Sequence, residues 1–197
     1  TVRPHQLVMT ATPIPRTLAM TMYADLDVSV IRELPPGRQS VQTVALSDKR
    51  RAEVVTRVRD ACRAGHRAYW VCPLIEESEA LDYENVTATH ALLSEALQGI
   101  AIGLIHGRMR AEEKDLVMKA FAAGQLQVLV ATTVIEVGVD VPEATVMIIE
   151  NAERFGLAQL HQLRGRVGRG RDKSTCILLY KAPLGETAKS RLSIMRE

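Results

Sequence analysis

Strand-like apolar runs alternate with helical patterns along most of the chain, and this alternation restricts the possible fold more than any other feature. The strand-like runs lie at 41–46, 67–72, 100–105, 127–131, 145–149 and 176–180. Helical patterns lie between or after them, at 48–64, 87–97, 112–123, 157–163 and 186–195. Strands joined by helices pair in parallel and need helices on both faces. The sequence therefore predicts an α/β, three-layer fold with a parallel central sheet.

A break rich in proline and glycine, Glu33–Arg38, suggests that the chain crosses a domain boundary. We predict that residues 1–36 are the end of one domain with its linker, and that 37–197 form a second domain. Before the break, the sequence favours a short helix at 16–23 and a strand at 26–31. Within the second domain, the acidic stretch 76–83 is expected to be an irregular surface insert.

Composition narrows the classes of function. The net charge is only +2, so any attraction to nucleic acid must come from local patches. Cys62, Cys72 and Cys176 are odd in number and widely spaced, which favours reduced core thiols over disulfides or a metal site. No apolar run approaches about 18 residues and no signal peptide opens the chain, so we expect a cytoplasmic protein without membrane contact. The scarcity of aromatic residues argues against a base-stacking platform.

The stretch from Gln162 to Arg169 carries the strongest chemical signal. Three arginines, at positions 164, 166 and 169, are interleaved with two glycines. Guanidinium groups bind phosphate oxygens in fixed geometry, and an arginine supplied by a neighbouring domain can stabilise the charge that develops on a γ-phosphate. The alternative is a solvated basic loop that follows a helix.

Functional loops of parallel sheets follow the carboxyl ends of the strands. We expect five segments to meet there: Thr10–Thr12, Pro73–Glu76, His106–Gly107, Thr132–Asp140 and the arginine stretch. Thr132 and Thr133 suit a phosphate of a nucleic-acid strand. Asp140, after a tight turn at Gly138, could accept a bond from a ribose hydroxyl or water.

Simpler interpretations of these residues remain open at this point. Thr10 and Thr12 could cap a turn, and Asp140 could cap the strand that follows a β-turn. His106 has no cysteine, carboxylate or second histidine at ligand spacing. We therefore predict that it is a hydrogen-bonding loop residue and that the chain holds no metal site.

The sequence contains no Gly-x-x-x-x-Gly-Lys-Ser/Thr phosphate-binding loop. An arginine stretch without such a loop predicts that another domain holds most of the nucleotide. The chain would then supply half of a nucleotide site.

The order of these motifs resembles motifs III to VI of superfamily-two helicases. The phrases at 10–17, 33–38, 71–78 and 150–161 resemble the RecG family of branch-migration helicases. This resemblance implies a RecA-like, P-loop NTPase-type fold, specifically a helicase C-terminal domain, with ATP and Mg²⁺ mostly held by a preceding motor domain. It implies the following roles: Arg166 and Arg169 as arginine fingers, Gln162 as a link to domain closure, Gly138 and Asp140 near the nucleotide, Thr132, Thr133, His106 and Gly107 near DNA, and Thr10 and Thr12 in coupling.

The same resemblance implies an ATP-dependent DNA helicase that reverses forks and migrates three- and four-way junctions in recombination and repair. Its partners would be branched or duplex DNA and the RecA-like and wedge domains of the same chain, in a monomer at the nucleoid. We expect residues from about Val41 to fold but not to hydrolyse ATP or unwind DNA unaided. One alternative is a duplex translocase of transcription-coupled repair, resembling the Mfd family. Another is a non-catalytic nucleic-acid-binding RecA-like module, against which Gln162, Arg166 and Arg169 argue.

Overall fold

The structure is a computed structural model that describes residues 29, 40–74, 79–132 and 141–196. The chain divides into two units, residues 1–36 and 37–197. All of the helices and strands that the structure describes lie in the second unit. The helix expected at 16–23 lies outside the described residues, as does the strand expected at 26–31 except for Ser29, which has no regular structure.

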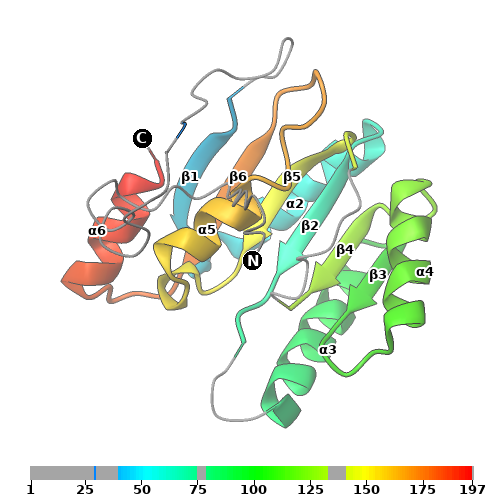
Figure 1. The fold of residues 1–197 in the computed structure, drawn as a ribbon, viewed down its shortest axis with the longest axis horizontal. Helices are drawn as coiled ribbons and strands as arrows, with labels where there is room; N and C mark the ends of the chain where they lie inside the picture. Colours follow the sequence, from blue (N-terminus) through cyan, green and yellow to red (C-terminus); the bar gives the residue numbers. More distant parts are fainter. Residues whose placement is uncertain (1–28, 30–39, 75–78, 133–140, 197) are drawn as a thin grey trace, which may run out of the picture. The chain divides into compact units, whose positions relative to one another are not determined.

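The described part of the second unit is built on a six-stranded sheet in which every pair of neighbours is parallel (Figure 1). Its strand order is β1-β6-β5-β2-β4-β3. The predicted parallel sheet is therefore confirmed, and each of the six strands predicted after residue 40 is present within one or two residues of its expected bounds. The strands are β1 (Gln42–Ser47), β2 (Arg67–Val71), β3 (Ile102–Ile105), β4 (Val128–Ala131), β5 (Ala144–Ile149) and β6 (Thr175–Tyr180).

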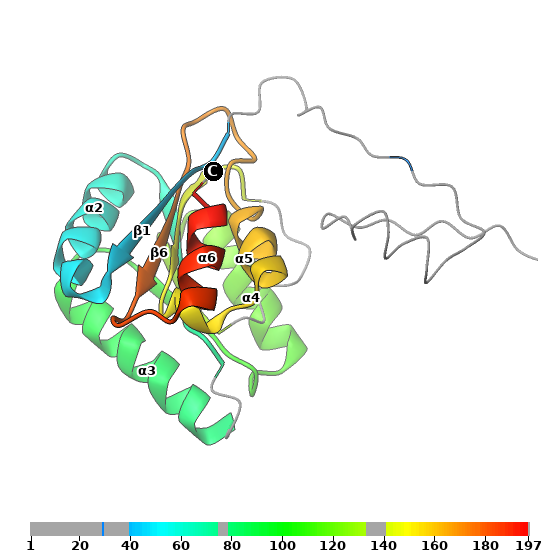
Figure 2. The same cartoon turned by 90° about the vertical axis from the view of Figure 1, so that its left-hand side faces the viewer.

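Helices cover both faces of the sheet, which gives the predicted three layers (Figures 1 and 2). One face carries α2 (Arg51–Arg63) and α3 (Glu79–Ala96). The other carries α4 (Ala111–Ala122), α5 (Leu157–Arg164) and α6 (Glu186–Ile194).

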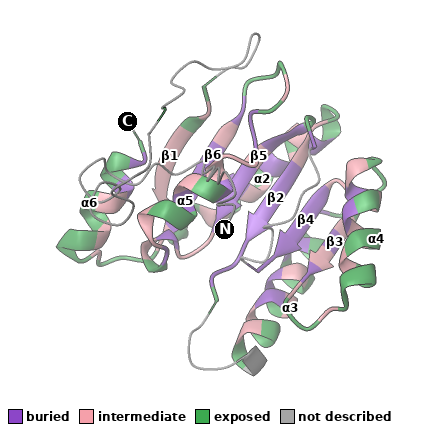
Figure 3. Ribbon diagram, in the orientation of Figure 1, coloured by how far each residue is buried: buried purple, intermediate pink, exposed green. Residues whose placement is uncertain are grey.

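Two apolar cores result, one on each side of the sheet. Trp70 and Tyr69 are consecutive on β2, so their side chains point to opposite faces, and each is fully buried in a different core. Tyr69 packs on Phe121 of α4, with ring centroids 4.9 Å apart. Burying a large apolar side chain stabilises a fold by roughly 1.5–3 kcal/mol. Figure 3 shows the central strands buried and the outer strands β1 and β3 only partly covered.

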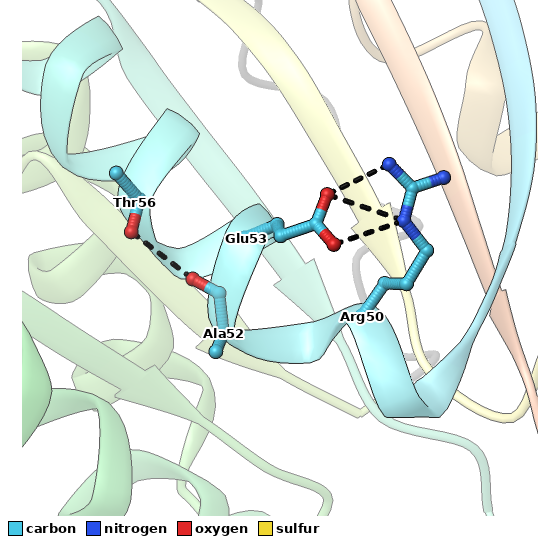
Figure 4. Close-up of polar contacts among 4 residues, drawn as sticks. All are labelled: Arg50, Ala52, Glu53 and Thr56. Atoms are coloured by element: carbon cyan, nitrogen blue, oxygen red, sulfur yellow. Dashed lines mark hydrogen bonds and ion pairs between the residues drawn. The ribbon is translucent and has the colours of Figure 1, made fainter.

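A short 3-10 turn, η1 (Asp48–Arg50), leads from β1 into α2, where the sequence predicted one continuous helix. Ser47 caps this turn: its hydroxyl accepts a bond from the Lys49 N–H at 3.4 Å. Arg50 then donates to the Glu53 carboxylate at 2.7 Å, and the Thr56 hydroxyl donates to the Ala52 carbonyl at 3.1 Å (Figure 4). The hydrogen bond between Arg50 and Glu53 raises the pKa of Arg50 and lowers the pKa of Glu53.

The start of α3 differs from the prediction. The helix begins at Glu79, whereas the sequence placed an irregular insert over 76–83 and the helix start at Thr87. The reason is that the first two turns bury little: Leu81 is 44% exposed and Tyr83 is 39% exposed. The helical spacing of buried residues becomes visible only from Val86 onward, through Leu93 and Leu97.

Because the strands are parallel, their carboxyl ends all lie along one side of the sheet, called here the carboxyl edge. Their amino ends lie along the opposite side, called here the amino edge. At the carboxyl edge, the chain leaves β3, β4 and β5 at His106, Thr132 and Glu150. At the amino edge, the chain enters the strands. These two edges position the residues that the sequence singled out.

Candidate functional site

Two of the residues predicted to contact nucleic acid lie side by side at the carboxyl edge. Thr132 follows β4 and His106 follows the neighbouring β3, and the Thr132 N–H donates to the Ile105 carbonyl at 3.2 Å. Thr132 is buried, and its hydroxyl has no hydrogen-bond partner in the part of the chain that the structure describes. The same holds for Nδ1 of His106. A ligand that satisfies these two polar atoms would recover the cost of burying them.

His106 sits in a partly buried, positively charged setting. The ring of Tyr83, on α3, meets the imidazole edge to face, with centroids 4.9 Å apart. Burial lowers the pKa of His106, and the nearby charges of Lys114 and Arg108 lower it further. A neutral imidazole offers one donor and one acceptor, which suits hydrogen bonding more than ion pairing.

Gly107 lies exposed beside His106, and its carbonyl accepts a bond from Nζ of Lys114 at 3.3 Å. A Cβ atom there would meet nothing within 4 Å. The glycine therefore leaves backbone open at the carboxyl edge, where a bulky ligand could approach it.

A polar network that the sequence did not predict lies at the carboxyl edge, just beyond the ends of β2 and β5. Glu150 lies 2.8 Å from the Arg51 guanidinium as an ion pair, and it accepts bonds from the Thr89 hydroxyl at 3.5 Å and the Cys72 thiol at 3.7 Å. The Arg51 guanidinium also lies 5.5 Å from the centroid of the Trp70 ring. The network ties α2 and α3 to β5.

The thiols are held in their neutral form. Burial, and after it the nearby Glu150 charge, raise the pKa of Cys72 to about 12. Burial likewise raises the pKa of Cys62 to about 11 and the pKa of Cys176 to about 12. All three cysteines are free and buried, as the sequence predicted.

The arginine stretch lies at the amino edge, so the expectation that it joins the carboxyl-end loops is wrong. After β5, helix α5 runs back across the sheet, and the loop 165–174 then enters β6 (Figure 1, orange). The contacts of this loop are with residues that precede other strands. The Asp172 carboxylate lies 4.0 Å from His66, and the Ser174 carbonyl accepts a bond from the Gln42 N–H at 2.9 Å. The error arose from counting this loop as one that follows a strand, although it follows a helix.

The three arginines of the stretch, one at the end of α5 and two in the loop, differ in their contacts. Arg164 turns toward the domain and donates to the Met195 carbonyl at 3.4 Å, and it lies 3.0 Å from His161. Arg166 is partly exposed and Arg169 is exposed, with Nε of Arg169 donating to the Gly165 carbonyl at 3.1 Å. Fully buried Val167 anchors the segment between them. Gln162 is exposed on α5.

Two glycines shape the loop. Gly168 has φ +75°, a conformation that side-chain-bearing residues rarely adopt. A Cβ atom on Gly170 would lie 2.7 Å from the Pro142 carbonyl oxygen, so the loop packs directly on the residues that lead into β5. Thr133, Gly138 and Asp140 lie outside the described residues, as do Thr10 and Thr12. The described Pro142, two residues after Asp140, lies against Gly170 of the arginine loop.

Within the described ranges, no group of three or more histidine, cysteine, aspartate or glutamate side chains could hold a metal ion. Those ranges also contain no helix long and apolar enough to cross a membrane.

Comparison with known proteins adds a family match. The model of the helicase conserved C-terminal domain matches residues 49–171. Over 98% of its length the chain is 64% identical to the ATP-dependent DNA helicase RecG of Escherichia coli O127:H6 and 63% identical to that of Acidithiobacillus ferridurans. RecG of Bacillus subtilis is 50% identical over the same share. The chain spans 28% of the length of each of these relatives.

Solved structures agree with the fold. A structure of RecG bound to a three-way DNA junction matches 94% of this chain and 24% of that one, with a TM-score of 0.80 and 49% identity. Dbp5 of S. cerevisiae, bound to RNA and ADP BeF3, matches with a TM-score of 0.64 at 15% identity, which supports the fold alone. The fold is thus RecA-like, as the resemblance to superfamily-two helicases implied.

Proposed function

This chain belongs to the family of helicase conserved C-terminal domains, and we propose that it is the second motor domain of an ATP-dependent DNA helicase that acts on branched DNA. The observation that carries the proposal is the 63–64% identity to RecG over 98% of the chain. The 49% identity to RecG bound to a three-way junction favours branched DNA as the substrate.

In this proposal the two edges of the sheet serve two ligands. The carboxyl edge binds a DNA strand through Thr132, His106 and Gly107, with Thr133 beside them. Support comes from the buried hydroxyl of Thr132 and the buried Nδ1 of His106, which lack hydrogen-bond partners among the described residues. Phosphate and sugar oxygens are suitable partners for both.

The amino edge would face ATP. Arg166 and Arg169 would reach the γ-phosphate, Gln162 would link nucleotide state to domain closure, and Gly138 and Asp140 would lie near the nucleotide. The residues fit this role in part: guanidinium groups suit phosphate, and the arginine loop packs through Gly170 on Pro142, two residues after Asp140. Since the sequence has no phosphate-binding loop, a preceding motor domain would hold most of the ATP and its Mg²⁺.

Residues 1–36 would be the end of that preceding motor domain and its linker, with Thr10 and Thr12 in coupling, and 37–197 the second motor domain. Closure of the cleft on ATP and opening after hydrolysis would step the protein along DNA. The complete protein, a monomer in the cytoplasm with a wedge domain at the junction, would reverse forks and migrate junctions in recombination and repair.

The test uses the complete protein that carries this chain, with a synthetic three-way junction and a linear duplex of equal length. We expect ATP-dependent strand separation of the junction and stronger stimulation of ATP hydrolysis by the junction than by the duplex. The isolated chain, purified in parallel, should neither hydrolyse ATP nor separate strands. Equal stimulation by both substrates would favour a duplex translocase, and DNA binding without hydrolysis would favour a non-catalytic module.

A further inference from the structure

Two side chains without a role so far, Tyr83 and Arg108, form a stack with His106 at the carboxyl edge. The Arg108 guanidinium lies 5.4 Å from the centroid of the Tyr83 ring, and the same ring meets His106 at 4.9 Å with an interplanar angle of 77°. Tyr83 comes from α3, whereas His106 and Arg108 come from the loop after β3. We call this set the Tyr83 stack.

The stack lies on the surface and presents a positive charge. Tyr83 is 39% exposed, and Arg108 is exposed with no ion-pair partner within the described ranges. The nearby Glu113 carboxylate already accepts a bond from the Arg110 N–H at 2.8 Å, where α4 begins. Among the described residues, therefore, no ion pair neutralises the Arg108 charge.

A guanidinium held over an aromatic ring is well prepared to bind phosphate. The ring restricts the long arginine side chain in advance, so less conformational entropy is lost on binding. A guanidinium is also more weakly hydrated than an ammonium group and binds phosphate oxygens through paired N–H groups.

We propose that Arg108 binds a backbone phosphate of the DNA strand that passes Thr132 and His106, and that Tyr83 is a positioning residue for Arg108. The contact of Tyr83 with His106 places this phosphate site next to the strand site. The proposal rests on the proposed function, because it extends the same DNA path from β4 across β3 to the start of α3. It does not require base stacking.

The salt dependence of DNA binding tests this proposal in the complete protein. Each phosphate contact adds about 0.9 to the slope of log affinity against log salt for duplex DNA and about 0.7 for a single strand. Arg108→Ala should reduce the slope by about that amount and weaken binding about five- to eightfold at ~0.1 M salt. Arg63→Ala is the matched control, because Arg63 is an exposed arginine in the last turn of α2, toward the opposite edge, and should leave the slope unchanged.

Three further variants separate the effect of the Arg108 charge from the effect of its position. Arg108→Lys keeps the charge, so the slope should match that of the wild type. Tyr83→Leu keeps Arg108 but removes its platform, so affinity should fall while the slope is preserved, and Tyr83→Phe should bind like the wild type.

The outcomes are distinct. An Arg108→Ala line parallel to that of the wild type would overturn the phosphate contact and leave only a packing role for the stack. A wild-type protein that binds no DNA junction would overturn the proposed function and this inference together. Normal wild-type binding with an unchanged Arg108→Ala variant would overturn this inference alone.

Discussion

Substituting Gly170 by alanine should misplace the arginine loop. The added Cβ would lie 2.7 Å from the Pro142 carbonyl oxygen, below the 3.0 Å that real Cβ contacts respect. The loop or the Pro142 segment must therefore move by at least 0.3 Å, the difference between these distances. The loop and the Pro142 segment both flank the proposed nucleotide side of the domain. A movement that relieves the contact between the added Cβ and Pro142 therefore shifts Arg166 and Arg169 relative to the bound nucleotide.

The size of the effect follows from the contact. Overpacking costs about 1–3 kcal/mol, while replacing glycine stabilises by about 0.4–1 kcal/mol through the unfolded state, which leaves a net loss of roughly 0–2.6 kcal/mol. A misplacement of about 1 Å can cost about 100-fold in rate, so a shift of 0.3 Å scales to roughly fourfold in ATP turnover.

The assay is DNA-stimulated ATP turnover of the complete protein, with hydrogen exchange of the loop 165–174 as the structural readout. Gly185→Ala is the matched control, because a Cβ there meets nothing within 4 Å. We expect Gly170→Ala to lower kcat with little change in KM and to speed exchange in the loop. If Gly170→Ala matched Gly185→Ala in both measurements, the packing argument would be refuted.

Other predictions concern the carboxyl edge, the thiols and the isolated chain. Arg51→Met and Glu150→Gln, made singly and together, should show a coupling of about 1 kcal/mol in denaturant unfolding, because their ion pair is only partly exposed; strictly additive effects would argue against the network. The free energy of unfolding should fall as pH rises from 9 toward 11, because unfolded thiols ionise there while Cys62, Cys72 and Cys176 stay protonated in the fold; Cys176→Ala should flatten this decline. The isolated chain should show no ATP hydrolysis above a buffer blank, and turnover by a preparation free of contaminants would contradict the half-site proposal.

The sequence predicted the layered sheet well because each strand is short, apolar and followed by a helix with a visible buried face. It placed α5 and β6 within one residue, for example. It failed at the start of α3, because Leu81 and Tyr83 are too exposed to give a helical pattern of burial.

The candidate site was only partly predictable. His106 and Thr132 follow strands directly, so the topology brings them together as expected. The arginine loop follows a helix, and its location depends on the direction of α5, which residue type alone does not give. The Arg108 contact with Tyr83 joins two elements 25 residues apart, and no local pattern indicates it. A tyrosine near a helix start and a His-Gly-Arg sequence after the next strand are weak signals that acquire meaning only together.

The central claim is that this domain supplies the arginines of an ATP site shared with another motor domain. The most direct measurement is ATP turnover by the complete protein on a three-way junction, comparing wild type, Arg169→Ala and the control Arg171→Ala, an exposed arginine in the same loop. We predict that Arg169→Ala lowers turnover by roughly 10³-fold while ATP binding is retained, and that Arg171→Ala stays near wild type. Full turnover by Arg169→Ala would contradict the claim.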